Sequence, residues 1–155
     1  MKSDLMHATA RFDTARSKCL ETPASGSLGK PFGEPWFDPA LWGFNESGDL
    51  HGTIPEGLGP EGYRGIVHGG AIAALLDSAM THCLFGRDVM ALTAEIKVKY
   101  HRPLPVGQEV RICAKLEATV GGQIYRLTAS ISSGDELKAE ASGTFFRPPG
   151  DRKPV

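Results

Sequence analysis

The stretch Gly65–Phe85, GIVHGGAIAALLDSAMTHCLF, decides the fold of this chain. From Ala71 onward it predicts a helix, because Ala, Leu and Met favour helices and no Pro interrupts them. Apolar residues cover nearly every face of this helix, which predicts that it is buried rather than amphipathic. Asp77 nevertheless lies in its middle. A buried carboxylate is unfavourable unless it has a partner or a function.

His68, Gly69 and Gly70 come directly before this predicted helix. Glycines at a helix start leave its first free N–H groups open to an approaching oxygen. Together with Asp77, they are the strongest indication of a catalytic site in the sequence. Structural alternatives stay open for each: His68 capping the helix, the two glycines allowing close packing, and the carboxylate satisfied by a neighbouring hydroxyl or a partner subunit.

The composition is that of an ordinary globular domain. The 155 residues are 41% hydrophobic and 23% charged, enough for one domain with a core. The net charge of −1 gives no reason to expect a nucleic acid or a membrane surface as partner. No apolar run approaches the roughly 20 residues of a membrane-spanning helix.

The N-terminal residues and the cysteines predict a location. The opening sequence MKSDLMHATARF lacks the apolar core of a signal peptide. Cys19, Cys83 and Cys113 are odd in number and lack the spacing of metal ligands. Reduced thiols, a cytoplasmic location and no metal site are therefore expected.

The chain divides into three predicted regions. Residues 1–35 are expected to be an N-terminal extension, with a helix at Ser3–Leu20 followed by a linker rich in Pro, Gly and Ser. Residues 36–147 are expected to form the folded domain. Residues 148–155 are expected to be a C-terminal tail.

Alternating apolar residues predict strands on both sides of the helix. Two short strands come before it, at Leu41–Phe44 and Leu50–Ile54. Four longer strands follow as an antiparallel meander, because the apolar period changes from 3.6 to 2; they are Leu92–Tyr100, Val110–Ala118, Tyr125–Ile131 and Leu137–Phe145. In each of these four, the first residue and every second one after it form the apolar face. Thr93 therefore falls on the polar face.

The order of these elements predicts an α+β fold. A helix that is apolar on every side has more surface than one sheet face can cover. The sheet must therefore curl around it, and a second copy of the chain is expected to cover the rest, which predicts a homodimer.

These residues resemble the hotdog-fold thioesterases, specifically the phenylacetate-pathway-like branch of the 4-hydroxybenzoyl-CoA thioesterase superfamily. The resemblance covers roughly residues 36–146 and is carried by Gly65–Gly70, the ALLD ending at Asp77, Leu92–Tyr100 with Arg102-Pro103, and Gly143–Phe145. It implies a hotdog fold, in which a curved antiparallel β-sheet wraps a long buried central helix.

The resemblance also implies hydrolysis of an acyl-CoA thioester, with CoA as part of the substrate and no further cofactor. Asp77 would be the nucleophile or the general base toward water. The Gly69 N–H would bind the thioester oxygen, and His68 would orient or polarise the thioester. The hydroxyl of Thr93 would help to hold water, unless it only bonds a neighbour in the strand.

Three further residues are expected to contact the substrate: Gly62, Arg64 and Gly70. Many relatives carry an Asn six residues before the His, where this chain has Gly62, and glycine offers no side-chain donor. Arg64 could meet CoA phosphates, although a solvated surface charge is the alternative. His51 and Cys83 have no predicted role in catalysis, and Cys83 is expected in the core.

The spacing of His68 and Asp77 predicts a site built by two chains. Nine helical residues span about 13 Å, so both side chains of one chain cannot touch one carbonyl group. The resemblance implies that the helix start of one subunit faces the Asp of the other, in a dimer or a dimer of dimers. Two alternatives stay open: a non-hydrolytic hotdog protein that binds acyl-CoA or another apolar ligand, and a hotdog dehydratase or hydratase.

Overall fold

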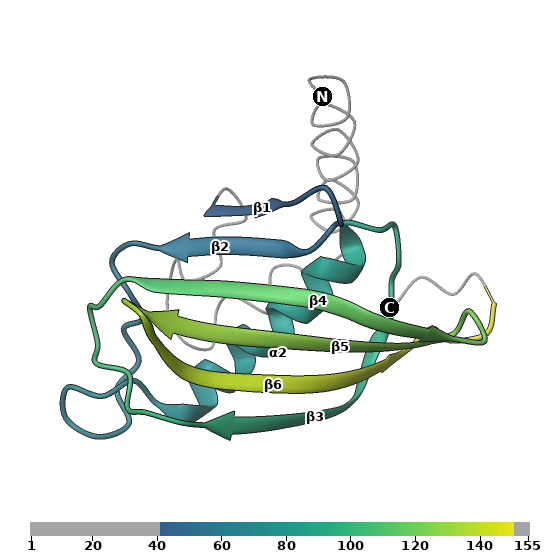
Figure 1. Ribbon diagram of the computed structural model, residues 1–155. Helices are drawn as coiled ribbons and strands as arrows, with labels where there is room; N and C mark the ends of the chain where they lie inside the picture. Colours follow the sequence, from purple (N-terminus) through teal and green to yellow (C-terminus); the bar gives the residue numbers. More distant parts are fainter. Residues whose placement is uncertain (1–40, 151–155) are drawn as a thin grey trace.

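The computed structural model describes residues 41–150, in which one helix packs against a six-stranded antiparallel sheet (Figure 1). The elements are β1 (Trp42–Phe44), β2 (Leu50–Ile54), α2 (Gly69–Phe85), β3 (Leu92–Tyr100), β4 (Val110–Val120), β5 (Ile124–Ser133) and β6 (Glu136–Phe146). The predicted helix Ser3–Leu20 lies outside the described residues. Among residues 41–150, no helix is long and apolar enough to cross a membrane.

The sheet has the strand order β1-β2-β4-β5-β6-β3, and all neighbouring strands are antiparallel. β4, β5 and β6 form an antiparallel meander, but the predicted four-strand meander is wrong for β3, which pairs with β6 at the edge opposite β1 and not with β4 (Figure 1). The chain therefore crosses the width of the sheet between β2 and β3, and α2 is the crossing element. The apolar period identifies strands but does not say which of them are neighbours.

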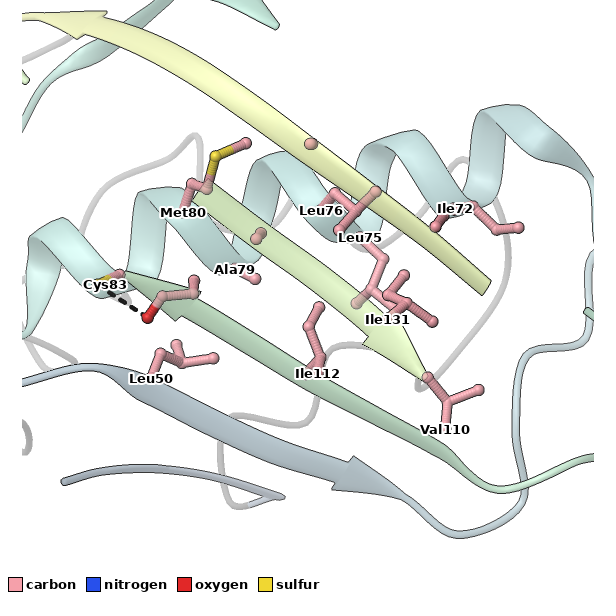
Figure 2. Packing of buried hydrophobic residues seen from close by; sticks show 14 of the residues in the cluster. Leu50, Ile72, Leu75, Leu76, Ala79, Met80, Cys83, Val110, Ile112 and Ile131 are labelled. Carbon is pink, nitrogen blue, oxygen red and sulfur yellow. Dashed lines mark hydrogen bonds between the residues drawn. The ribbon is translucent and has the colours of Figure 1, made fainter. Parts of the chain in front are cut away.

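The core lies between α2 and one face of the sheet. Leu75 and Leu76 of α2 are fully buried and belong to one cluster with Ile112 of β4 and Ile131 of β5 (Figure 2). The prediction of an α+β fold, with a curved sheet around a central helix, is confirmed. The side of α2 that carries Asp77 is only half-buried in the single chain.

α2 begins two residues earlier than predicted. Gly69 and Gly70 are its first helical residues, and His68 is the N-cap, with φ −61° and ψ 131°. Glycine is a poor helix former, so the sequence alone favoured a start at Ala71. The cap overrides this preference, because the His68 side chain accepts a hydrogen bond from the Gly70 N–H at 2.8 Å.

A β-bulge in β3 reverses the alternation that the sequence predicts for its first residues. Thr93 pairs with Phe145 of β6, which is buried, whereas Glu95 pairs with Thr144, so Ala94 is the extra residue. One extra residue exchanges the two faces of a strand. Thr93 therefore lies on the helix side of the sheet, and its predicted place on the polar face is wrong.

Four residues that the alternation placed on the apolar face lie elsewhere for the same reason. Leu92 and Ala94 are exposed at the sheet edge, Leu92 before the bulge and Ala94 within it. A register shift in β4 turns Ala118 to the outer face, where it pairs with an exposed arginine. Another shift, between β5 and β6, leaves Leu137 39% exposed and buries Lys138 instead.

Gly52→Ala is expected to lower the free energy of unfolding by about 1–3 kcal/mol, because overpacking displaces well-packed neighbours. Gly52 of β2 lies opposite Trp42 of β1, and an added Cβ would overlap the Trp42 indole ring. Gly43→Ala is the matched control, since a Cβ there meets nothing within 4 Å. Urea denaturation of both variants measures the difference; equal midpoints would contradict this packing.

Candidate active site

Within the part of the chain that the structure describes, the start of α2 presents a single free backbone N–H group. The first four amides of a helix lack partners within it. Here the His68 N–H bonds Pro60 O at 2.7 Å, the Gly70 N–H bonds the His68 ring, and the Ala71 N–H bonds His68 O at 2.9 Å. Among residues 41–150, no acceptor is found for the Gly69 N–H. Among the described residues, Gly69 thus has the one backbone N–H at the helix start that is available to an oxygen, whereas the Gly70 N–H is occupied.

The His68 side chain caps the helix and still has a ring N–H that can donate a hydrogen bond. Its Nδ1 accepts the hydrogen bond from Gly70, so the neutral ring carries its proton on Nε2. The side chain is exposed. Capping, which was the structural alternative for His68, therefore does not prevent it from donating a hydrogen bond to a ligand.

Tyr100 holds the Gly69 peptide from the other side. Its hydroxyl donates a hydrogen bond to Gly69 O at 2.8 Å, and the ring would be at an ordinary contact distance from a Cβ at Gly69. The residue is 52% exposed and ends β3 on the helix side of the sheet. Strand alternation placed Tyr100 on this face, but no spacing signal connected it with the helix start.

Asp77 is bonded to β3 by the residue that the bulge re-orients. The Thr93 hydroxyl donates a hydrogen bond to Asp77 Oδ1 at 2.8 Å. Burial raises the pKa of the Asp77 carboxyl above its usual value, and the hydrogen bond from Thr93 offsets part of that rise. Thr93 and Asp77, predicted to act together, are thus brought into contact by the structure.

The helix itself does not satisfy the Asp77 carboxylate. Thr81 donates to the backbone oxygen of Asp77 at 3.0 Å, not to its side chain. His82 donates through Nδ1 to Ser78 O at 2.8 Å, and Cys83 is fully buried. His82 and Cys83 are therefore part of the packing, which was the expectation for Cys83. In the described part of the chain, Thr93 is the one hydrogen-bond donor to this carboxylate.

The other predicted substrate residues lie before the helix. Gly62 packs against His68, because a Cβ on Gly62 would come within 3.1 Å of the His68 Cα. The position at which the resemblance leads us to expect Asn in many relatives therefore adjoins the helix start, although glycine supplies no donor. Arg64 is exposed, and its side chain has no hydrogen bond or ion pair to residues 41–150.

The two halves of the predicted site are separate within one chain. His68 and Gly69 lie at the start of α2, about 13 Å along the axis from Asp77 at 1.5 Å per residue. Within residues 41–150, no three His, Cys, Asp or Glu side chains are placed to hold a metal ion. The chemistry of this arrangement is that of a carboxylate and a backbone donor.

Thr93→Val is expected to move the acidic limb of the pH–rate profile to higher pH. The Thr93 hydrogen bond lowers the pKa of Asp77, so its loss raises that pKa further, and the ionised carboxylate is then lost at a higher pH. Measurement of kcat/KM across the acidic range tests this. Thr93→Ser, which keeps the hydroxyl, is the control; a limb that stays in place in Thr93→Val would show that Asp77 is not the titrating base.

Comparison with known proteins identifies the family of this chain. Residues 64–140 match the sequence model of the Thioesterase superfamily. Acyl-coenzyme A thioesterase THEM4 of Bos taurus is 33% identical over 89 residues, which are 56% of this chain and 36% of the relative. The chain thus spans little more than a third of the length of that curated relative.

Solved structures share the architecture. A crystal structure of a thioesterase superfamily protein is 27% identical, with a TM-score of 0.62, over 68% of this chain and 52% of that one. A Streptococcus mutans UA159 protein bound to acetyl-CoA has a TM-score of 0.62 at 17% identity, over 76% of this chain and 95% of that one. At the lower identity the likeness shows the fold alone. The sequence match and the shared helix-on-sheet architecture agree: the chain belongs to the thioesterase superfamily and has its hotdog fold.

Proposed function

We propose that this protein hydrolyses an acyl-CoA thioester to a free acid and CoA. The observation that carries the proposal is the pairing of two features of α2, the free Gly69 N–H and the Thr93-bound carboxylate of Asp77. The curated relative named an acyl-coenzyme A thioesterase supports the substrate class. A cytoplasmic location is part of the same proposal.

The reaction needs two groups from the protein: a donor that stabilises negative charge on the carbonyl oxygen, and a base or nucleophile. The Gly69 N–H, at the positive end of the α2 dipole, donates to the carbonyl oxygen as negative charge develops on it. Asp77 acts either as a general base that takes a proton from water or as the nucleophile. In the first route the water oxygen bonds the carbonyl carbon, the C–S bond breaks, and CoA leaves as a thiolate that is then protonated.

A second copy of the chain would bring the Gly69 N–H and the Asp77 carboxylate together. If two α2 helices pack antiparallel about a two-fold axis, Gly69 of one lies level with Asp77 of the other when the axis passes Ala73. Ala73 is midway between them in sequence and lies on the half-buried side of α2. Its small side chain permits close approach of the two helices.

The edge strand β3 is available for pairing in the same dimer. β3 pairs with β6 on one side and has no strand partner on the other among the described residues. Leu92 and Tyr100 are 43% and 52% exposed on it. An open edge strand favours pairing with another strand, so β3 meeting its own copy would continue the sheet beneath both helices. Pairing of two such dimers into a tetramer stays a prediction.

The test is release of free thiol from acyl-CoAs with short, long and aromatic acyl groups. Turnover by the wild type that is lost in Asp77→Ala is the expected result, and it would also identify the preferred acyl group. Equal turnover by both proteins would show that the water is activated elsewhere and that Asp77 is structural.

One observation favours a second function, non-hydrolytic binding of acyl-CoA or another apolar ligand. Gly62 stands against His68 where many relatives carry an Asn, so one side-chain donor is missing from the helix start. Saturable binding of acyl-CoA with no thiol release across the whole panel would establish that function in place of hydrolysis.

A further inference from the structure

A row of polar residues crosses the outer face of the sheet, on the side away from α2. Cross-strand pairing places it in register from β2 through β4, β5 and β6 to β3: His51, Cys113, Ser130, Glu140 and Lys99. Their sequence neighbours Leu50 and Ala139 are fully buried in the core, and alternation directs the row outward. This row takes no part in the site on α2.

Cys113 and His51 are in direct contact within this row. His51 Nδ1 lies 3.1 Å from Cys113 Sγ, and His51 Nε2 lies 3.3 Å from Asn45 Nδ2. The Asn45 amide is oriented by Asp49, whose backbone N–H bonds Asn45 Oδ1 at 2.9 Å. Asn45 therefore offers its NH₂ group to His51, which makes Nε2 the acceptor and leaves the ring proton on Nδ1. His51 then donates a hydrogen bond to the sulfur.

A hollow of about 540 Å³ opens beside Cys113 on this face. Charged side chains line it, three of them lysines and two of them glutamates: Lys97, Lys99, Lys115, Glu117 and Glu140. Glu117 already accepts a hydrogen bond from Thr128 at 2.6 Å, and Glu140 lies 3.1 Å from His101. The rest of the lining is Ser, Thr and Ala. Because the lysines outnumber the glutamates, the hollow favours a small anion.

We propose that Cys113 is a thiol-modification site that reacts with small anionic disulfides to form a mixed disulfide. Cys113 gives its proton to solvent, and its sulfur bonds one sulfur of the incoming disulfide while the S–S bond of that reagent breaks. The released half leaves as a thiolate and takes a proton from solvent. The lysines draw in the anion, and the His51 N–H stabilises the attacking thiolate.

The environment of Cys113 differs from that of the neighbouring core thiol. Burial raises the pKa of the Cys113 thiol, whereas Lys115 and Arg111 act in the opposite direction. Cys83 is fully buried and contacts Arg87 and the Ala114 carbonyl. Cys113 is half-buried and opens to the hollow. Cys83 is therefore an internal control for access within the same chain.

The test compares two disulfide reagents on the full chain: 5,5′-dithiobis(2-nitrobenzoate), which is anionic, and 4,4′-dithiodipyridine, which is neutral. Peptide mapping assigns each adduct to Cys19, Cys83 or Cys113. We expect the ratio of the anionic to the neutral rate at Cys113 to exceed the same ratio in the unfolded chain, and Cys83 to stay unmodified. Salt at about 1 M should slow the anionic reagent alone. A ratio at Cys113 no higher than in the unfolded chain would overturn the proposal.

Variants separate the two contributions. Replacing Lys97 and Lys99 by Gln should slow the anionic reagent about tenfold or more and leave the neutral one unchanged. Lys115 is kept in this variant because it lowers the pKa of Cys113. His51→Leu should slow both reagents, whereas His51→Asn, whose amide nitrogen can replace Nδ1 as donor, should recover part of the rate. Unchanged rates in the lysine variant, or equal rates in His51→Leu and the wild type, would each refute the assigned role.

Discussion

Gly69→Pro is expected to lower the rate of thioester hydrolysis about 100-fold or more, since loss of one oxyanion donor typically has an effect of that size. The substitution removes the one amide hydrogen at the start of α2 that has no acceptor among the described residues. The helix should tolerate it. Gly69 is the first helical residue, where proline is favoured, and His68 already has the extended conformation that proline requires before it.

Gly69→Ala is the matched control for this experiment. It keeps the N–H, and its Cβ would lie 3.5 Å from the Tyr100 ring, an ordinary contact. We expect kcat/KM of Gly69→Ala to stay close to that of the wild type, and circular dichroism to show the same helix content in both variants. Full activity of a folded Gly69→Pro protein would show that the oxyanion is stabilised by another group.

A mixture of Asp77→Asn and Gly69→Pro chains is expected to recover activity that neither has alone. Each parent should be about 100-fold or more below the wild type. In a mixed dimer, the Asp77→Asn chain contributes an intact Gly69, and its partner contributes an intact Asp77, which makes one complete site. Random pairing in equal amounts should therefore restore about one quarter of wild-type activity.

The recovery distinguishes a shared site from a site within one chain. The two proteins are mixed under mild denaturant and refolded together, with each parent refolded alone as the control. Thiol release from the preferred acyl-CoA is the measurement. Recovery far below a quarter, with mixed dimers demonstrated by mass spectrometry, would place both groups of the working site in the same chain.

Asp77→Asn carries a second consequence, for stability. The raised pKa of Asp77 means that the folded protein favours the protonated acid, so the ionised carboxylate destabilises the fold above that pKa. The neutral amide that this substitution introduces should therefore make the folded state more stable than the wild type at neutral pH. The difference, measured by urea denaturation at several pH values, should shrink as the pH falls and Asp77 becomes protonated.

The sequence predicted the elements well because each has a strong local signal. The apolar run from Ala71 to Phe85 predicted a buried helix, and the period-two stretches after it predicted strands; the structure has both. The helix start was misplaced by two residues, because glycine propensity argues against a helix. The hydrogen bond that decides the helix start is the one that the His68 side chain accepts from the Gly70 N–H.

The bulges could not be predicted from one strand at a time. Whether Ala94 is paired or left over depends on the register of β3 against β6, which is a property of both strands. The resemblance assigned Thr93 a role beside Asp77, whereas the alternation placed it on the opposite face. The extra residue reconciles the two. In the same way, His51 had no partner in the sequence, because cross-strand pairing alone brings Cys113 opposite it.

The capping of α2 also affects which part of an acyl-CoA, the thioester or the phosphates, would bind at the helix start. A helix start with several open amides can wrap a phosphate group, whose oxygens need several donors at once. Here three of the first four amides are already bonded within the chain, so Gly69 supplies a single backbone donor, and the His68 Nε2–H is a side-chain donor. Such a start matches one carbonyl oxygen and is poorly suited to a phosphate. If the substrate is an acyl-CoA, the helix start would therefore bind its acyl carbonyl group in preference to its phosphate groups.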